Sequence, residues 1–281
     1  MLDLPSDILE YYNQGREAGR LFRGNPLEML RTLDLLTRYL PSAPATVLDI
    51  GGGSGVYALW LAARGYSVHL IDPVPLHVKQ ATAGSAAQPD HPLASIQLGD
   101  ARALGFADNS VDAVLMLGPL YHLQDHADRI QAFREMYRVL NVGGVFCGAA
   151  ISRFAGFTDG VLRGMLSDPA YVSIVENGLR DGKHSPNGLA YFTNTYFHHP
   201  DELVTEAQAG GFLDGKVFAI EGLAGWSLGE HGFWNDPVQL DTILKFTRQL
   251  EREPSIIGAS SQLRVQAKVD REKVAKRPRK G

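Results

Sequence analysis

Short apolar runs recur along the chain, and most are followed by a segment in which apolar residues repeat every three or four positions. Such a run is typical of a strand buried on both faces, and such a repeat is typical of a helix with one buried face. Strand-like runs lie at 46–50, 67–71, 94–98, 111–117, 145–151, 216–221 and 262–269. Their alternation with helical segments predicts an α/β protein with a doubly wound, seven-stranded, mostly parallel sheet.

Two regions depart from this alternation. Residues 1–44 are expected to form an N-terminal helical cap, because Asn25 and Pro26 precede five leucines at helical spacing. Residues 152–199 carry scattered aromatic residues and glycines without a strand–helix repeat. This insertion follows the fifth strand, and ligands bind at the carboxyl ends of strands in open α/β sheets. We therefore expect 45–151 and 200–270 to form the core and 152–199 to form a lid or substrate insertion.

The first strand leads directly into a glycine-rich turn. Gly51, Gly53 and Gly55 alternate within it, and a helical segment and the second strand follow, ending at Asp72. Glycine allows a sharp turn and lets a ligand approach the backbone. An acidic residue about 20 positions after such a turn can accept the hydroxyls of a ribose. The unit from 47 to 72 therefore predicts a nucleoside-binding site.

The details of the turn distinguish between nucleosides. A dinucleotide turn has the spacing G-x-G-x-x-G, whereas Val56 occupies the third glycine position in this chain. Asp49 precedes the turn, where a carboxylate would repel a pyrophosphate but would suit a cationic, amino-acid-bearing ligand. The segment resembles motif I and the following acidic position of class I S-adenosylmethionine-dependent methyltransferases. The resemblance covers about 45–151 firmly and 200–270 loosely, and it implies a last strand that runs antiparallel.

The resemblance also implies which residues bind S-adenosylmethionine. Asp100 is expected near the adenine amino group and the backbone amide of Ala101 near a ring nitrogen, although Asp100 could equally cap a helix. The N-terminal helices of small-molecule members often fold over the cofactor, so a tyrosine and a basic residue from that region are included. The predicted cofactor-binding residues are Asp49, Gly51, Gly53, Gly55, Asp72, Pro73, Asp100, Ala101, Leu117, Tyr11 and Arg20, with Tyr12 as the neighbouring candidate.

Tyr121 and His122 follow the fourth strand, where the family delivers residues to the methyl group. Methyl transfer from a sulfonium requires alignment and exclusion of water. An acceptor hydroxyl, thiol or protonated amine also requires a base, and an imidazole titrates near neutral pH. His122 is therefore the candidate base or substrate contact, and Tyr121 could orient the acceptor or contact the sulfonium. Both residues could instead have packing roles.

Three residues of the insertion, Tyr196, His198 and His199, are candidates for a substrate wall. The adjacent histidines also suggest a metal site. No His, Cys or Asp lies at a regular ligand spacing from them, so we expect no metal.

The chain lacks residues that several other classes of nucleotide-binding enzyme require. None of the ten tyrosines has a lysine four positions later, as a short-chain dehydrogenase would need. The segment Gly118–Tyr121 lacks the amide or acid of an exocyclic-amine nucleic-acid methylase, and Cys147 lies in the fifth strand rather than after the fourth, as a cytosine-C5 methylase would need. These absences favour a small-molecule acceptor, with N, O, S or C left open as the methylated atom. A regulatory protein that binds S-adenosylmethionine without catalysis, or an RNA or protein methyltransferase, is the alternative.

Charge and composition indicate which partners and which cellular compartment to expect. The net charge of −4 argues against a general affinity for nucleic acid. The charge is uneven, because the segment from Lys268 to Lys280 holds seven basic residues against two acidic ones. We expect 271–281 to be a disordered basic tail. A single cysteine, no apolar run of about 18 residues and no apolar signal core together lead us to expect a cytoplasmic protein without a membrane segment. The oligomeric state cannot be derived from these patterns.

Overall fold

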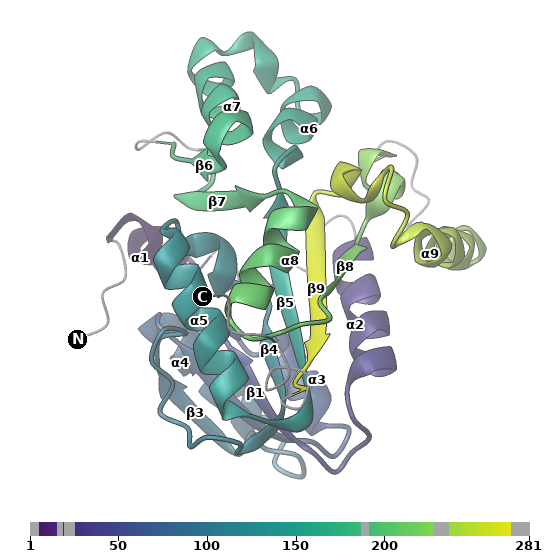
Figure 1. The fold of residues 1–281 in the computed structure, drawn as a ribbon. Coiled ribbons are helices and arrows are strands. Elements are labelled where there is room, and N and C mark those ends of the chain that lie inside the picture. The colour runs from purple at the N-terminus through teal and green to yellow at the C-terminus, as the bar shows by residue number, and fades with distance from the viewer. Residues whose placement is uncertain (1–5, 16–18, 20–25, 187–190, 228–235, 271–281) are drawn as a thin grey trace, which may run out of the picture.

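The computed structural model describes the chain except for residues 1–5, 16–18, 20–25, 187–190, 228–235 and 271–281. Its main sheet has the strand order β3-β2-β1-β4-β5-β9-β8 (Figure 1). The strands are β1 (Thr46–Ile50), β2 (Ser67–Asp72), β3 (Ser95–Leu98), β4 (Val111–Met116), β5 (Leu140–Ser152), β8 (Lys216–Ala219) and β9 (Gln262–Lys268). β9 pairs antiparallel with both of its neighbours, and the remaining pairs are parallel. The expected α/β sheet with an antiparallel last strand is confirmed.

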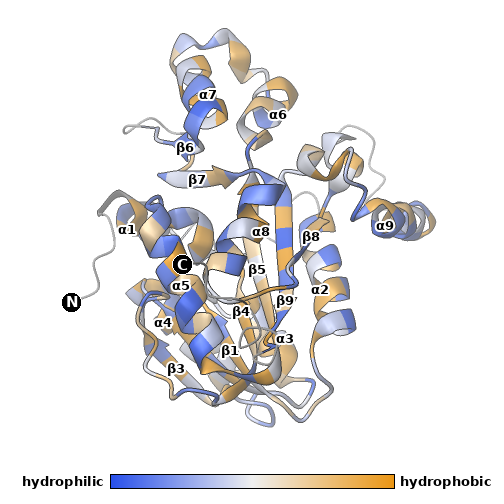
Figure 2. Ribbon diagram, viewed as in Figure 1, coloured by the Kyte–Doolittle hydropathy of each residue, from blue (hydrophilic) through white to orange (hydrophobic). Residues whose placement is uncertain are grey.

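Helices cover both faces of this sheet. The covering helices are α2 (Leu27–Tyr39), α3 (Val56–Ala62), α4 (Pro75–Ala86), α5 (His126–Val139) and α8 (Pro200–Ala209). α1 (Ser6–Asn13) packs on Val74 and Leu76 after β2, and α9 (Pro237–Leu250) packs against α2. Hydropathy along the ribbon shows largely apolar central strands, with apolar and polar residues mixed along the helices around them (Figure 2). This is the arrangement that the alternating pattern predicts.

Successive residues of the central strands enter different cores. Val47 of β1 packs in a cluster with Tyr57 and Leu61 of α3, whereas the next residue, Leu48, packs in a cluster with Phe133 of α5. Side chains alternate across a strand, so a parallel strand covered on both faces must be apolar at nearly every position. This explains why these strands appear in the sequence as continuous apolar runs.

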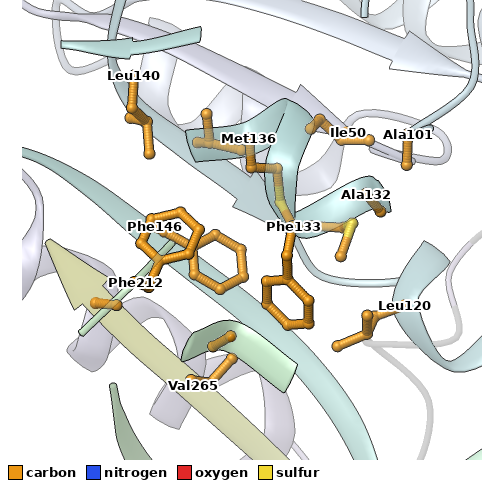
Figure 3. Close-up of a cluster of buried hydrophobic side chains, with 14 of the residues drawn as sticks. Ile50, Ala101, Leu120, Ala132, Phe133, Met136, Leu140, Phe146, Phe212 and Val265 are labelled. Carbon is orange, nitrogen blue, oxygen red and sulfur yellow. The ribbon is translucent and has the colours of Figure 1, made fainter. Parts of the chain in front are cut away.

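The core beneath α5 and α8 is rich in aromatic residues. Phe146 of β5 stacks on Phe212 with ring centroids 5.1 Å apart, and Phe133 packs edge-on against Phe146 at 5.6 Å. Figure 3 shows these rings with Met136 and Leu140 around them. All five side chains are fully buried, so this cluster fixes α5 against the sheet.

The insertion contains two helices and a short hairpin. These elements are α6 (Ala155–Leu162), α7 (Pro169–Asp181), β6 (Lys183–His184) and β7 (Thr195–His198), with the 3-10 helix Met165–Ser167 between the two helices. β7 adds to the main sheet by pairing parallel with the last two residues of β5, and β6 pairs antiparallel with β7. The insertion stands beyond the carboxyl ends of the central strands (Figure 1). The aromatic and glycine-rich sequence did not reveal these helices.

A buried ion pair connects α5, α8 and β7. The guanidinium of Arg129 donates to both carboxylate oxygens of Glu206 at 2.7–3.0 Å, and Nε2 of His198 lies 3.1 Å from the same carboxylate. The ring of Tyr196 covers the Arg129 guanidinium at 3.6 Å. Although burial raises the pKa of Glu206, the hydrogen bonds from His198 and Arg129 outweigh it and lower that pKa to about 2. The carboxylate therefore stays ionised and holds the base of the insertion to the core.

Candidate active site

A cavity of about 490 Å³ opens at the carboxyl ends of β1, β2 and β4. This is the edge of the sheet at which open α/β folds bind ligands. Residues from the glycine-rich turn, from the ends of β2, β3 and β4, from α1 and from the insertion line it. Among them are Tyr12, Asp49, Gly51, Gly53, Asp72, Pro73, His77, Asp100, Ala101, Leu117, Tyr121, His122, Gln124 and Asn194.

The three glycines of the turn have backbone angles in the left-handed region. Their φ values are +64° at Gly51, +58° at Gly53 and +87° at Gly55. At Gly51 a Cβ atom would lie 2.1 Å from Cγ of Pro119, the proline that follows β4. The turn and the loop that follows β4, called the β4 loop below, therefore approach each other so closely that only glycine fits at position 51. Gly51 and Gly53 line the cavity. Gly55 is not among the lining residues and instead occupies the N-cap position of α3.

Asp72 ends β2 and holds the turn in place. Its Oδ2 accepts a hydrogen bond from the backbone N–H of Gly53 at 2.9 Å, and its Oδ1 accepts from the backbone N–H of Val74 at 2.9 Å. Nδ1 of His77 lies 3.0 Å from the same Oδ1. The side chain is almost completely buried at the wall of the cavity. Asp72 thus organises the glycine-rich turn in addition to its predicted contact with a ribose.

Asp49 is a buried acid in the cavity wall. It is 1% exposed, and its Oδ2 has no hydrogen-bond partner among the residues that the structure describes. Burial raises the pKa of the Asp49 carboxyl to about 7, and the charge of Asp72 adds to the shift. A buried carboxylate without a partner is costly, and a bound cation would offset that cost. This matches the cationic ligand expected from the sequence.

Asp100 lies at the end of β3 with Ala101 beside it, and both line the cavity. The carboxylate of Asp100 accepts from the guanidinium of Arg102 at 2.6 Å and from the Arg102 backbone N–H at 2.8 Å. Arg102 also reaches Asp128 at 2.7 Å. Although burial raises the pKa of Asp100, the hydrogen bonds from Arg102 outweigh it and hold that pKa below its usual range. Asp100 therefore stays ionised at the wall of the cavity.

The end of the cavity near β4 is formed by aromatic side chains. Tyr121 and His122 lie in the 3-10 helix Pro119–His122, with ring centroids 4.7 Å apart. Nε2 of His122 is 2.7 Å from the hydroxyl of Tyr12, and Nδ1 is 3.4 Å from the carbonyl oxygen of Asn194. His122 is thus the point at which α1, the β4 loop and the insertion meet. Leu117 precedes these residues and lines the same cavity.

Of the two N-terminal tyrosines, Tyr12 lines the cavity. Tyr11 is not among the lining residues and packs edge-on against the rings of Tyr12 and Phe192 at 5.3 and 5.5 Å. Consecutive residues of a helix point about 100° apart, so only one of the pair can face the ligand. The prediction for Tyr11 is therefore corrected to Tyr12. Arg20 lies outside the described residues.

The proposed substrate wall of Tyr196, His198 and His199 is corrected by the structure, because none of the three lines the cavity. Tyr196 and His198 belong to the Arg129–Glu206 network, and His198 is fully buried. His199 caps α8: its backbone N–H donates to Glu202, which completes a capping box. The sequence places these residues in the insertion correctly, but their side chains stabilise its attachment to the core.

Other cavity residues were missed by sequence reasoning. His77 lies in the first turn of α4, two residues after the helix begins at Pro75, and this position turns its ring back toward Asp72. The spacing between an acid at a strand end and a histidine in the next helical turn is a signal that could have revealed it. Gln124 and Asn194 carried no such signal, because the fold of the insertion determines their positions.

Among the described residues, no group of three His, Cys, Asp or Glu side chains is arranged to hold a metal ion. Within the same part of the chain, no helix has the length and apolar character needed to cross a bilayer.

Comparison with known proteins agrees with this geometry. Residues 48–148 match the family profile described as a methyltransferase domain. An uncharacterised methyltransferase of Mycobacterium tuberculosis is 36% identical over 132 residues, which are 46% of this chain and 48% of the relative. The methyltransferase GfsG of Streptomyces halstedii is 36% identical over 148 residues, which are 52% of this chain and 48% of the relative. The chain thus spans about half the length of the curated relatives it matches.

The fold is also similar to that of a solved S-adenosylmethionine-dependent methyltransferase from Methanosarcina mazei. The TM-score is 0.57 at 19% sequence identity, over 84% of this chain and 96% of the other. The matched domain contains the glycine-rich turn, Asp72, Asp100 and the β4 loop, which together form most of the cavity. Residues 48–148 therefore match a methyltransferase domain in sequence, and the fold of the chain is that of solved S-adenosylmethionine-dependent methyltransferases.

Proposed function

We propose that the protein transfers a methyl group from S-adenosylmethionine to a small-molecule acceptor, with His122 as the residue that receives the acceptor proton. The observation that carries the proposal is one cavity lined both by three acids and by a histidine among aromatic rings. The acids are Asp49, Asp72 and Asp100, and the histidine His122 lies with Tyr12 and Tyr121. A cationic nucleoside held by the acids would share this cavity with the histidine.

The three acids and the glycine-rich turn fit this cofactor. The partnerless oxygen of Asp49 is a site for a positive charge, and the left-handed backbone at Gly51 and Gly53 leaves the turn open to a ligand. Asp72 has an oxygen position left for a hydroxyl after its three hydrogen bonds in the structure. The carboxylate of Asp100 is held by Arg102 at the cavity wall, where the resemblance expects the adenine.

The bound cofactor supplies a methyl group that is already activated by its sulfonium, so the chain has to align the acceptor, exclude water and remove a proton. A carbonyl oxygen only accepts hydrogen bonds, so Nδ1 of His122 donates to Asn194 and carries the ring proton. In the neutral imidazole the lone pair is then on Nε2, the atom next to the Tyr12 hydroxyl. Nε2 accepts from the Tyr12 hydroxyl, so the acceptor proton would reach His122 through that hydroxyl, which passes its own proton to Nε2 as it receives the acceptor's.

The surroundings of the cavity support a small acceptor. Tyr12 from α1 and Asn194 from the insertion both line it, so both segments that flank the core contribute to the walls. A concave site built from several segments in this way suits a compound small enough to enter it.

Calorimetry with S-adenosylhomocysteine tests the cofactor assignment. We expect binding by the wild-type protein, weaker binding by the Asp72→Ala variant, and unchanged binding by Asp90→Ala, which alters an exposed loop. Absence of binding by the intact protein, or preferred binding of NAD, would reject the proposal.

Incubation with methyl-labelled S-adenosylmethionine and a panel of hydroxyl, thiol and amine compounds tests catalysis. We expect one class to be methylated, and we expect His122→Ala to lower its turnover by roughly 100-fold or more while S-adenosylhomocysteine affinity stays the same. Full turnover by His122→Ala would reject its role as base. Tight cofactor binding without methylation of any acceptor would favour a regulatory protein.

A further inference from the structure

We propose that His77 is an additional cofactor-binding residue, whose Nε2 accepts a hydrogen bond from one ribose hydroxyl of the nucleoside while Asp72 accepts from the other. The inference rests on the proposed use of S-adenosylmethionine and concerns how this chain recognises the sugar.

The position of His77 provides the first observation. Its ring is 4% exposed and lines the cavity beside Asp72. Nδ1 lies 3.0 Å from Oδ1 of Asp72, and because a carboxylate oxygen only accepts, Nδ1 carries the proton. In the neutral ring Nε2 is therefore a hydrogen-bond acceptor. This atom is buried and has no hydrogen-bond partner among the described residues.

The hydrogen bonds of Asp72 provide the second observation. Oδ1 accepts from the backbone N–H of Val74 at 2.9 Å and from Nδ1 of His77 at 3.0 Å. These two hydrogen bonds use both lone pairs of Oδ1. Oδ2 accepts from the backbone N–H of Gly53 at 2.9 Å and has one lone pair left. A ribose presents two neighbouring hydroxyls, so Asp72 can receive only one of them. Nε2 of His77 is the second acceptor on the same wall.

Energetics favour the same assignment. A buried acceptor without a partner destabilises the free protein, and a ligand hydroxyl would remove that cost on binding. The ring of Tyr12 packs edge-on against the imidazole with centroids 5.3 Å apart, which shields this end of the cavity from water. The hydrogen bond would then form in surroundings where it is stronger than at an exposed surface.

Calorimetry with S-adenosylhomocysteine and its 2′-deoxy and 3′-deoxy analogues tests the proposal. For the wild-type protein we expect each missing hydroxyl to weaken binding. For His77→Leu we expect affinity for S-adenosylhomocysteine to fall by about 5- to 10-fold, and affinity for one deoxy analogue to become nearly equal to it. The lone pair freed on Asp72 would face the leucine methyl groups, so it cannot replace the lost acceptor.

Two further variants complete the experiment. His91→Leu changes an exposed histidine outside the cavity and should bind all three ligands as the wild type does. His77→Gln places an amide oxygen near the position of Nε2 and should retain part of the discrimination between the hydroxyls, which also provides a reading if His77→Leu does not fold.

The outcomes separate this inference from the proposed function. One outcome is that the wild type binds S-adenosylhomocysteine while His77→Leu keeps both the wild-type affinity for it and the wild-type preference for it over the two deoxy analogues. In that case the inference is wrong and the cofactor assignment stands. If the wild type does not bind S-adenosylhomocysteine, the proposed function itself fails.

Discussion

The hydroxyl of Tyr12 is within 2.7 Å of Nε2 of His122, and this hydrogen bond joins the first helix of the chain to the loop after β4. The same tyrosine ring packs against His77, which contacts Asp72. Tyr12 therefore connects His122 with the pair of Asp72 and His77, although it lies 110 residues from His122 in the sequence.

The first prediction concerns this hydrogen bond. Tyr12→Phe keeps the ring and removes the hydroxyl, so His122 loses one of the contacts that orient it. We expect turnover of the identified acceptor to fall by roughly 10-fold while S-adenosylhomocysteine affinity changes little, because one hydrogen bond contributes about 1 kcal/mol. Steady-state kinetics and calorimetry measure the two effects. Tyr11→Phe is the control, since Tyr11 does not line the cavity; equal turnover by both variants would contradict the prediction.

The second prediction concerns Asp49. Its pKa is raised to about 7, so at pH 6 the carboxyl is mostly protonated in the free protein. A cationic ligand favours the ionised form, so binding at pH 6 should release a proton, and affinity for S-adenosylmethionine should rise between pH 6 and pH 8. Calorimetry in buffers of different ionisation enthalpy measures the released proton. We expect Asp49→Asn to bind more weakly and to lose this pH dependence, while Asp90→Asn keeps it. Binding by the wild type that does not vary with pH would count against the role of Asp49.

The third prediction compares two glycines. Gly51→Ala and Gly143→Ala both place a side chain at positive φ, +64° and +81°, which costs about 1–2 kcal/mol. Only at Gly51 would the new Cβ meet Pro119, at 2.1 Å, whereas nothing lies within 4 Å at Gly143. We expect both variants to be less stable in urea unfolding, and only Gly51→Ala to lose S-adenosylhomocysteine binding. Equal binding by the two would show that the contact between the turn and the β4 loop is not needed.

The fourth prediction concerns the buried ion pair. Arg129→Met leaves Glu206 as a buried carboxylate without a guanidinium partner, beside His198 at 3.1 Å and the exposed His126 at 3.8 Å. The free energy of unfolding should fall by about 3–5 kcal/mol, because an uncompensated buried charge is strongly destabilising. Arg163→Met removes an exposed pair with Asp159 and should cost less than about 1 kcal/mol. Urea denaturation compares the two; similar losses would mean that the buried pair does not anchor the insertion.

The fifth prediction follows from Glu221. Burial raises its pKa to about 7, and the charge of Glu28 adds to the shift. The folded pKa lies above the unfolded one, so the folded protein binds more protons between about pH 4.5 and pH 7, and this group lowers stability as pH rises through that window. We expect Glu221→Gln to lose less stability than the wild type between pH 5 and pH 8 in urea unfolding. Asp49 shifts in the same direction, so part of the slope should remain in the variant.

The glycine-rich turn and the acids of the cavity could be predicted from sequence because they are local. Gly51, Asp72 and Asp100 each lie at a strand end that the apolar pattern identifies, and the parallel sheet brings strand ends to one edge. The seven strands of the core were located within a few residues for the same reason.

The surroundings of His122 depend on contacts between distant segments, which no spacing rule provides. Tyr12 and Asn194 reach His122 only because α1 and the insertion fold against the β4 loop. The histidines at 198 and 199 were chosen for their chemistry, but the ion pair of Arg129 with Glu206 and the cap of α8 determine where they point.

Ile151 and Ser152 at the end of β5 are paired with Phe197 and His198 of β7. The 42 residues from 153 to 194 therefore leave the sheet and return to an adjacent strand, so the two ends of this excursion stay side by side whatever lies between them. A segment attached in this way can change in length and sequence while the strand register beneath it remains the same. Under the proposed function, the cavity wall that Asn194 contributes can therefore vary independently of the glycine-rich turn and Asp72, which are proposed to hold the methyl donor.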